Sequence, residues 1–130
     1  MKINVILGFL DPRDPEKKSA RRAVVLGEVF KDGRRYLLVA PATTYYQRKG
    51  VVPPGHVLIQ AQSPCRKGSG FSPDIDILVS VRDARFFSAT SPWLAEAQVV
   101  GQLNLANDKR VLDRFIEEMR RFQPREVFID

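Results

Sequence analysis

A two-residue turn between two apolar runs constrains this chain more than any other feature of its sequence. Asp32-Gly33 separates the run 23–30 from the run 35–40. Tight hairpin turns need positive φ angles at their central residues, and an Asp-Gly pair adopts them readily. The turn therefore predicts two antiparallel strands whose register is set by the short connection between them.

Further short apolar runs predict more strands. In the run 75–82, apolar residues alternate with polar or smaller ones, which is typical of a half-buried strand. The remaining predicted strands are 3–8, 56–61 and 97–105. Between the strands, three segments predict loops because prolines or Gly-Ser-Pro clusters interrupt them. These are 11–22, the long segment 41–55 that starts at Pro41, and 62–74, which we expect to be a mobile surface loop.

Only the end of the chain predicts a helix. Between residues 108 and 122, apolar residues recur at steps of three and four while charged residues take the other face. Asn107 or Asp108 would cap the first turn, and Pro124 would stop the helix. The pattern predicts a mainly β fold, a small barrel or strongly bent sheet with one amphipathic helix, in a single domain over residues 1–130.

The net charge of +6 is confined to the first part of the chain. Residues 1–50 hold 11 Lys and Arg against 5 Asp and Glu, whereas residues 51–130 hold 10 against 10. This asymmetry favours a basic surface that binds a polyanion or an acidic partner. The single cysteine predicts no internal disulfide and favours the reducing cytoplasm. The apolar run 3–10 is too short to span a bilayer, so no membrane partner is expected.

The residues exclude several kinds of catalysis. With one histidine and one cysteine, the chain offers no spacing for a zinc site, and no motif indicates a cofactor. His56, at the head of a predicted strand, is more often a structural or surface residue than a base. What remains is a group of basic, hydroxyl and aromatic side chains around the predicted hairpin. Its members are Arg21, Arg22, Thr43, Thr44, Tyr45, Tyr46, Arg82 and Asp83.

These side chains suit single-stranded nucleic acid. Arginine binds phosphate through two N–H groups, threonine donates to a phosphate oxygen, and tyrosine stacks on an unpaired base. Counting back from the turn brings Arg22, at the start of one strand, near Thr43, at the end of the other. The interpretation requires these two side chains to lie side by side on one face of the sheet.

At these residues the sequence resembles the MazF/PemK family of toxin–antitoxin endoribonucleases. The similarity follows the order of four segments: "RRAVVLGEV", "VAPATTYYQRKGVVPPGHVLI", "DILVSVRD" and "VVGQLNLANDKRVLDRFIEEM". Arg22 stands in the place of the family arginine, and Thr43 in the place of the family threonine. The match covers residue 3 to about residue 122, nearly the whole chain.

The resemblance implies an SH3-like barrel of the CcdB/MazF type that forms a homodimer. It implies metal-independent cleavage of single-stranded RNA, mRNA in particular, by attack of a ribose 2′-hydroxyl on the adjacent phosphate. Arg22 and Thr43 would be catalytic, and a cognate antitoxin with an acidic tail would neutralise the enzyme. The surrounding residues would bind RNA: Lys17, Lys18, Arg21, Thr44, Tyr45, Tyr46 and Arg82.

The chain departs from the family pattern at three places. Ala23 replaces the family proline, and Lys17 stands where a glutamate aligns, with Glu16 one step away. Asp83 directly follows Arg82, where relatives space the two further apart. The general base is therefore open among Glu16, Asp83 and His56. The departures also favour an alternative function: a catalytically inactive barrel that serves as a protein- or RNA-binding regulatory module.

Overall fold

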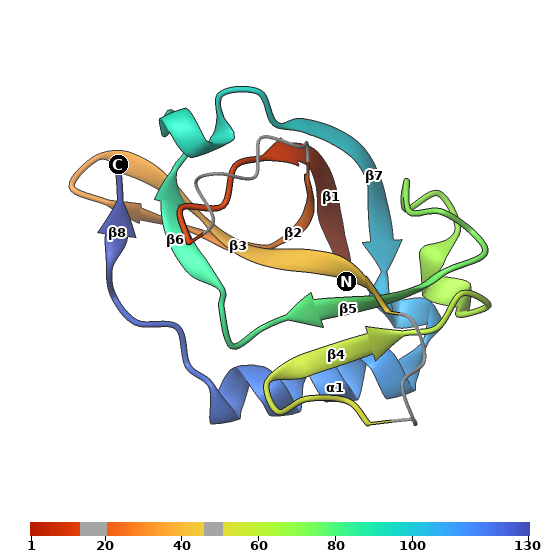
Figure 1. Cartoon of the computed structure of the whole chain (residues 1–130). Helices are drawn as coiled ribbons and strands as arrows, with labels where there is room; N and C mark the ends of the chain where they lie inside the picture. Colours follow the sequence, from red (N-terminus) through yellow and green to blue (C-terminus); the bar gives the residue numbers. More distant parts are fainter. Residues whose placement is uncertain (14–20, 46–50) are drawn as a thin grey trace.

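In the described part of the chain, a computed structural model shows a curled, mostly antiparallel sheet and one α-helix (Figure 1). The structure describes residues 1–13, 21–45 and 51–130. In the described part, the sheet order is β4-β5-β3-β2-β1-β7, and β6 pairs with both β3 and β8. The strands are β1 (Lys2–Phe9), β2 (Arg21–Lys31), β3 (Arg34–Tyr45), β4 (His56–Ile59), β5 (Asp76–Ser80), β6 (Arg85–Ser88), β7 (Gln98–Asn104) and β8 (Phe128–Ile129). The prediction of a mainly β fold with one helix is confirmed.

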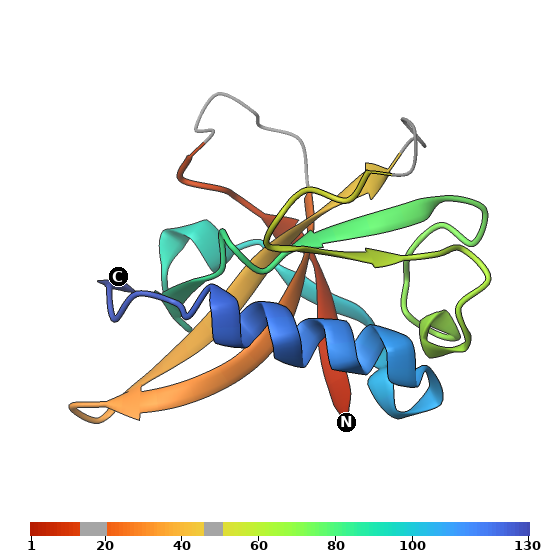
Figure 2. The ribbon, with the colours of Figure 1, turned by 90° about the horizontal axis from the view of Figure 1, so that it is seen from below.

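The predicted hairpin is present, and its strands are longer than expected. Asp32 has φ 52° and Gly33 φ 77°, the positive angles that the turn requires. β2 and β3 pair from Lys31 with Arg34 back to Ala23 with Pro41. Figure 2 shows this hairpin projecting beyond the end of the sheet.

The prediction that a loop begins at Pro41 is wrong. β3 continues through Pro41 to Tyr45 because its partner on one edge changes at this point. β6 pairs with β3 only as far as Val39, and β5 takes over from Ala42. Pro41 has no N–H to donate, and on this edge it lies where neither strand pairs with β3, so no ladder hydrogen bond is lost there.

The loop 62–74 packs against the sheet, although its composition predicts a mobile surface segment. It contains a 3₁₀ turn, Pro64–Arg66, whose Cys65 and Arg66 are buried. The Arg66 guanidinium donates to the carbonyl oxygens of Ile75, at 2.7 Å, and of Ser72. The loop also lies against β7, since a side chain at Gly101 would meet its backbone at less than 3 Å.

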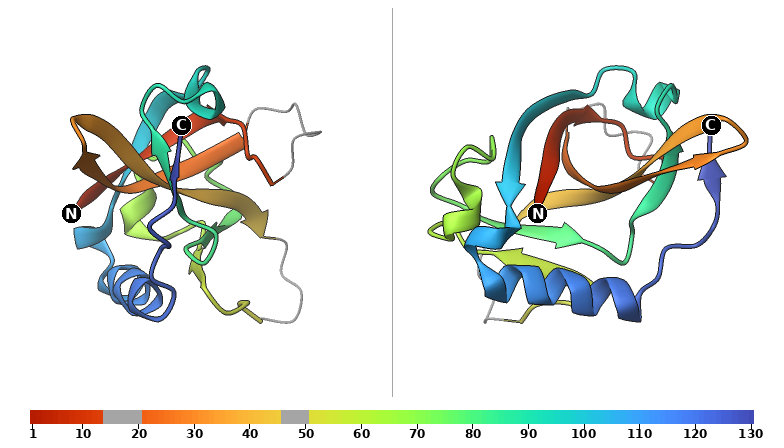
Figure 3. Two further views of the ribbon diagram at one scale, coloured as in Figure 1. Left: turned by 90° about the vertical axis from the view of Figure 1, so that its left-hand side faces the viewer. Right: turned by 180° about the vertical axis from the view of Figure 1, so that it is seen from behind.

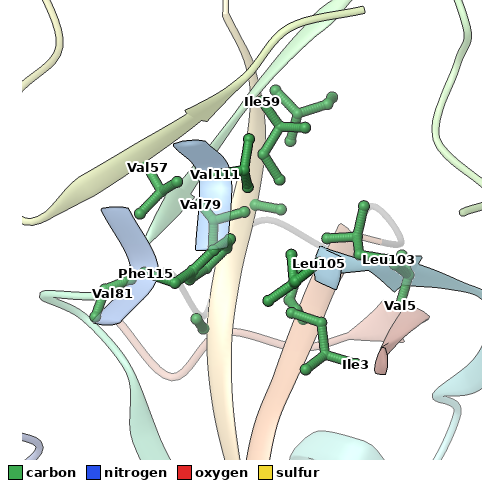
Figure 4. Close-up of a cluster of buried hydrophobic side chains, with 14 of the residues drawn as sticks. Ile3, Val5, Val57, Ile59, Val79, Val81, Leu103, Leu105, Val111 and Phe115 are labelled. Atoms are coloured by element: carbon green, nitrogen blue, oxygen red, sulfur yellow. The ribbon is translucent and has the colours of Figure 1, made fainter. Parts of the chain in front are cut away.

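Two hydrophobic cores lie on opposite sides of the curled sheet. The small core fills the ring formed by β7, β1, β2, β3 and β6, which is seen from behind in Figure 3. It consists of Ile6, Phe9, Ala23, Val39, Phe87 and Leu94. The large core lies between the sheet and the helix, and Figure 4 shows it. Its central residues are Ile3, Val5, Val57, Ile59, Val79, Val81, Leu103, Leu105, Val111 and Phe115.

The helix α1 (Lys109–Arg121) lies beside β4 and closes the large core (Figure 1). Of the two predicted capping residues, Asp108 caps it by accepting a hydrogen bond from the Val111 N–H. Beyond α1, the chain turns back along the molecule and β8 pairs in parallel with β6. Neither β6 nor β8 was predicted, since each is too short to show a periodic pattern.

Candidate RNA-binding face

The two adjacent arginines of β2 point to opposite faces of the sheet. On β1, Arg21 pairs with Phe9 and Arg22 with Leu7, across a bulge at Gly8. Directly paired residues share a face. Phe9 belongs to the small core, so Arg21 lies on the small-core face and Arg22 on the large-core face.

The two threonines of β3 are divided in the same way. Thr44 pairs with Ile77, which belongs to the large core, whereas Thr43 pairs with Leu78 on the other face. Both threonines are exposed. The small-core face therefore presents Arg21 with Thr43, and the large-core face presents Arg22 with Thr44.

A β-bulge in β2 produces this arrangement. Between the turn and the pair Gly27–Leu38, the register is the one that the turn sets. The next pair is Val25 with Val39, so Leu26 is an extra residue in β2 without a partner on β3. Without the bulge, the register would set Arg22 across from Thr43. With the bulge, the register is shifted by one residue. When it is continued beyond the pair Ala23–Pro41, it sets Arg21 across from Thr43. The prediction that Arg22 and Thr43 lie side by side is wrong for this reason.

Arg22 instead contacts the loop 62–74. Its Nε–H donates to the Gly70 carbonyl oxygen at 3.0 Å. Gly70 lies against β7, since a side chain there would meet the Val100 backbone at 2.8 Å. Arg22 thus links β2 to a loop that packs on another strand, which is a structural contact.

The small-core face carries a group of polar side chains, here called the outer patch. Ser80 and His56 pair with each other on this face, one row away from Thr43 and Leu78. The Ser80 hydroxyl donates to Asp83 at 2.6 Å, and Arg13 bridges Asp83, at 2.8 Å, and Asp11, at 2.6 Å. The outer patch consists of Asp11, Arg13, Arg21, Thr43, His56, Ser80 and Asp83.

Both carboxyl groups of the outer patch are held in the ionised form. Burial alone would raise the pKa of Asp83, but hydrogen bonds from Ser80 and Arg13 outweigh burial and lower the pKa below the ordinary 3.8. The pKa of Asp11 is lowered as well. Burial alone would raise it, but hydrogen bonds from Arg13 outweigh burial, and the charge of Arg21 lowers it further. Because its carboxylate is occupied by two donors, Asp83 is a weak candidate for the general base.

His56 is better placed to exchange a proton. Its Nδ1 lies 3.1 Å from the Pro54 carbonyl oxygen, a contact that is a hydrogen bond when Nδ1 carries the proton. In that tautomer of the neutral ring, Nε2 is the acceptor. The turn before His56 is fixed by a buried carboxylate, since the Gly55 N–H donates to Glu118 Oε2 at 3.1 Å.

The other predicted site residues are placed as follows. Tyr45 is half-buried and its hydroxyl donates to the Val51 carbonyl oxygen at 2.8 Å. Arg82 is exposed next to Asp83, and its backbone N–H donates to the Gly55 carbonyl oxygen at 3.0 Å. Glu16, Lys17, Lys18 and Tyr46 lie outside the described residues.

Comparison with known proteins finds no matching family model, no matching curated protein and no matching solved structure. Over the ranges that the structure describes, no helix has both the length and the apolar character needed to cross a membrane.

Proposed function

We propose that this protein is a metal-independent endoribonuclease of the toxin type that cuts single-stranded RNA on the outer patch. The observation that carries the proposal is the shared face of Arg21 and Thr43, with His56 on the same face two strands away, on β4. A guanidinium, a hydroxyl and an imidazole on one surface are the groups that phosphoryl transfer without metal needs. Arg21 thereby takes the role that the sequence resemblance gives to Arg22.

In the proposed reaction, His56 Nε2 takes the proton of a ribose 2′-hydroxyl as its oxygen attacks the adjacent phosphorus. The bond from phosphorus to the 5′-oxygen breaks, and this oxygen takes a proton from water. The products are a 2′,3′-cyclic phosphate and a 5′-hydroxyl. Arg21 stabilises the extra negative charge on the phosphorane, and the Thr43 hydroxyl donates to a phosphate oxygen.

The broader expectations from the resemblance belong to the same proposal. They are an SH3-like barrel of the MazF/PemK type, a homodimer, and a cytoplasmic setting with mRNA as substrate. A cognate antitoxin with an acidic tail would bind the basic N-terminal region. The charge asymmetry of the sequence supports this part, because 11 of the 21 basic residues lie in the first 50.

Two adjacent substitutions of equal charge test the assignment. RNA cleavage is measured in excess EDTA for the wild type, Arg21→Ala and Arg22→Ala, each with its unfolding curve. We expect Arg21→Ala to lower the rate by roughly 10²–10³, as loss of one preorganised donor does. Arg22→Ala should affect stability more than rate, because it removes the link to Gly70. If Arg22→Ala abolishes cleavage and Arg21→Ala does not, the assignment to the outer patch is wrong.

A second function has one observation in its favour. Asp83 is occupied by Ser80 and Arg13, and Arg22 by the Gly70 carbonyl, so two of the groups that the resemblance marks are engaged in structural contacts. This favours a barrel that binds RNA or a protein without cutting. Such a protein would bind single-stranded RNA while leaving it intact after long incubation at high enzyme concentration.

A further inference from the structure

A second basic site lies next to the outer patch, in a cleft of about 520 Å³. One wall is the turn that joins β5 to β6, and the other is the chain that leaves the end of α1; Figure 1 shows the two running close together. The volume falls within the range of small-molecule sites, about 300–1,000 Å³. Asp83 lines the cleft and also belongs to the outer patch, so the two sites are contiguous.

Three arginines from three segments line this cleft: Arg82 from the turn, Arg85 from β6 and Arg125 from the C-terminal segment. All three are exposed, and over the described residues none of them forms an ion pair or a side-chain hydrogen bond. The one carboxylate in the lining, Asp83, is already neutralised by Arg13 at 2.8 Å. The cleft is therefore strongly positive, with its guanidinium groups available to a ligand.

The rest of the lining is apolar except for Gln123. Phe122 and Pro124 are half-buried and Ala84 is buried, and the Arg121 guanidinium lies over the Phe122 ring, 5.6 Å from its centroid. An aromatic ring and a proline beside guanidinium groups suit a ligand with an anionic head and a planar body. A nucleotide has this chemistry, since arginines bind the phosphate and the base stacks on an aromatic ring or a proline.

We propose that this cleft binds a nucleotide of single-stranded RNA that flanks the phosphate held at the outer patch. The inference deepens the proposed function and rests on it for the identity of the ligand. Arg82 and Arg125, on opposite walls, would contact one phosphate, and the base would lie against Phe122 and Pro124. An RNA strand that crosses Asp83 would reach both sites at once.

The test separates binding from cleavage by using an RNA oligonucleotide in which every 2′-hydroxyl is methylated. Its affinity is measured by fluorescence anisotropy at several salt concentrations for the wild type, Arg82→Ala and Arg125→Ala. Each substitution should weaken binding about tenfold, the effect of one lost charged hydrogen bond, and reduce the salt slope by about 0.7. Arg110→Ala is the matched control, because Arg110 is equally exposed but lies at the start of α1, about 15 Å of helix away.

If Arg82→Ala and Arg125→Ala bind as tightly as Arg110→Ala, the inference is wrong, whatever the protein does to natural RNA. A mononucleotide arm distinguishes the source of the phosphate. Should adenosine or uridine monophosphate bind as tightly as the oligonucleotide, the cleft holds a free nucleotide and the RNA inference falls. Should the wild type bind in the predicted way but fail to cut natural RNA, the cleft stands and the nuclease proposal falls.

Discussion

Replacing Glu118 with alanine should lower the free energy of unfolding by about 2–4 kcal/mol. This is a large effect for a charged residue of a helix, since most such residues are exposed and their substitution changes stability little. Glu118 is fully buried, and its Oε2 accepts the Gly55 N–H at 3.1 Å. Its Oε1 lies 2.9 Å from an Arg114 nitrogen without making a hydrogen bond. The carboxylate thus joins α1 to the turn that leads into His56.

The magnitude follows from these contacts. Leaving the buried Gly55 N–H without a partner costs about 1–3 kcal/mol. Losing the packed methylene adds about 1 kcal/mol. The ion pairs of Oε1 with Arg114 and, at 3.7 Å, with Arg121 contribute at most about 1 kcal/mol together, since both arginines are about half exposed, and relief from burying a charge offsets part of that.

Glu117→Ala is the matched control, because Glu117 is the neighbouring residue, is 55% exposed and also pairs with Arg114. This variant should change stability by less than about 0.5 kcal/mol. Both variants are measured by urea unfolding, with equal m values as the condition for comparison. If the two substitutions cost the same, the buried carboxylate does not hold the turn and the reasoning is refuted.

Three further predictions concern other parts of the molecule. Arg13→Ala removes the guanidinium that lowers the pKa of Asp11 and Asp83. In the wild type, the stability that these two ionised carboxylates contribute is lost as the pH falls below 3.8. The variant lacks this contribution, so its free energy of unfolding should fall less steeply with pH in the acid range. The Cys65 thiol, whose pKa burial raises, should react with a disulfide reagent far more slowly in the native protein than in urea. Gly33→Ala should lower the free energy of unfolding in urea by about 1 kcal/mol. The cause is the positive φ alone, since no atom lies within 4 Å of the added carbon. An unchanged free energy of unfolding would mean that the turn has another conformation.

The parts of the fold that depend on local chemistry could be predicted from the sequence. The Asp32-Gly33 turn and the Asp108 cap each rest on a few neighbouring residues, and both are present. The continuation of β3 past Pro41 could not be predicted, because it depends on β6 and β5 meeting the same edge of β3 from much later in the chain. The burial of the loop 62–74 likewise depends on β7.

The predicted placement of Arg22 beside Thr43 was wrong by one residue, and the cause is physical. The register counted from the turn is correct only as far as Gly27. Because Leu26 is an extra residue, each residue of β2 before it lies on the opposite face from the one that the count predicts. A glycine inside a predicted strand is a known sign of a bulge, so Gly27 was the available signal. The bulge moves the arginine that faces Thr43 from Arg22 to Arg21.

Asp83 lies between the two proposed anion sites, and this gives Arg13 a specific role. An unpaired carboxylate 4 Å from a phosphate would repel it by about 4 kcal/mol at an effective dielectric constant near 20. Arg13, 2.8 Å from Asp83, cancels most of that charge without lining the cleft. Arg13→Ala should therefore weaken binding of the methylated oligonucleotide, and adding Asp83→Asn should restore most of the affinity. If Arg13 had only a structural role, Asp83→Asn would not restore binding, because it weakens a further hydrogen-bonded group. Continued weak binding by the double variant would therefore refute the charge argument.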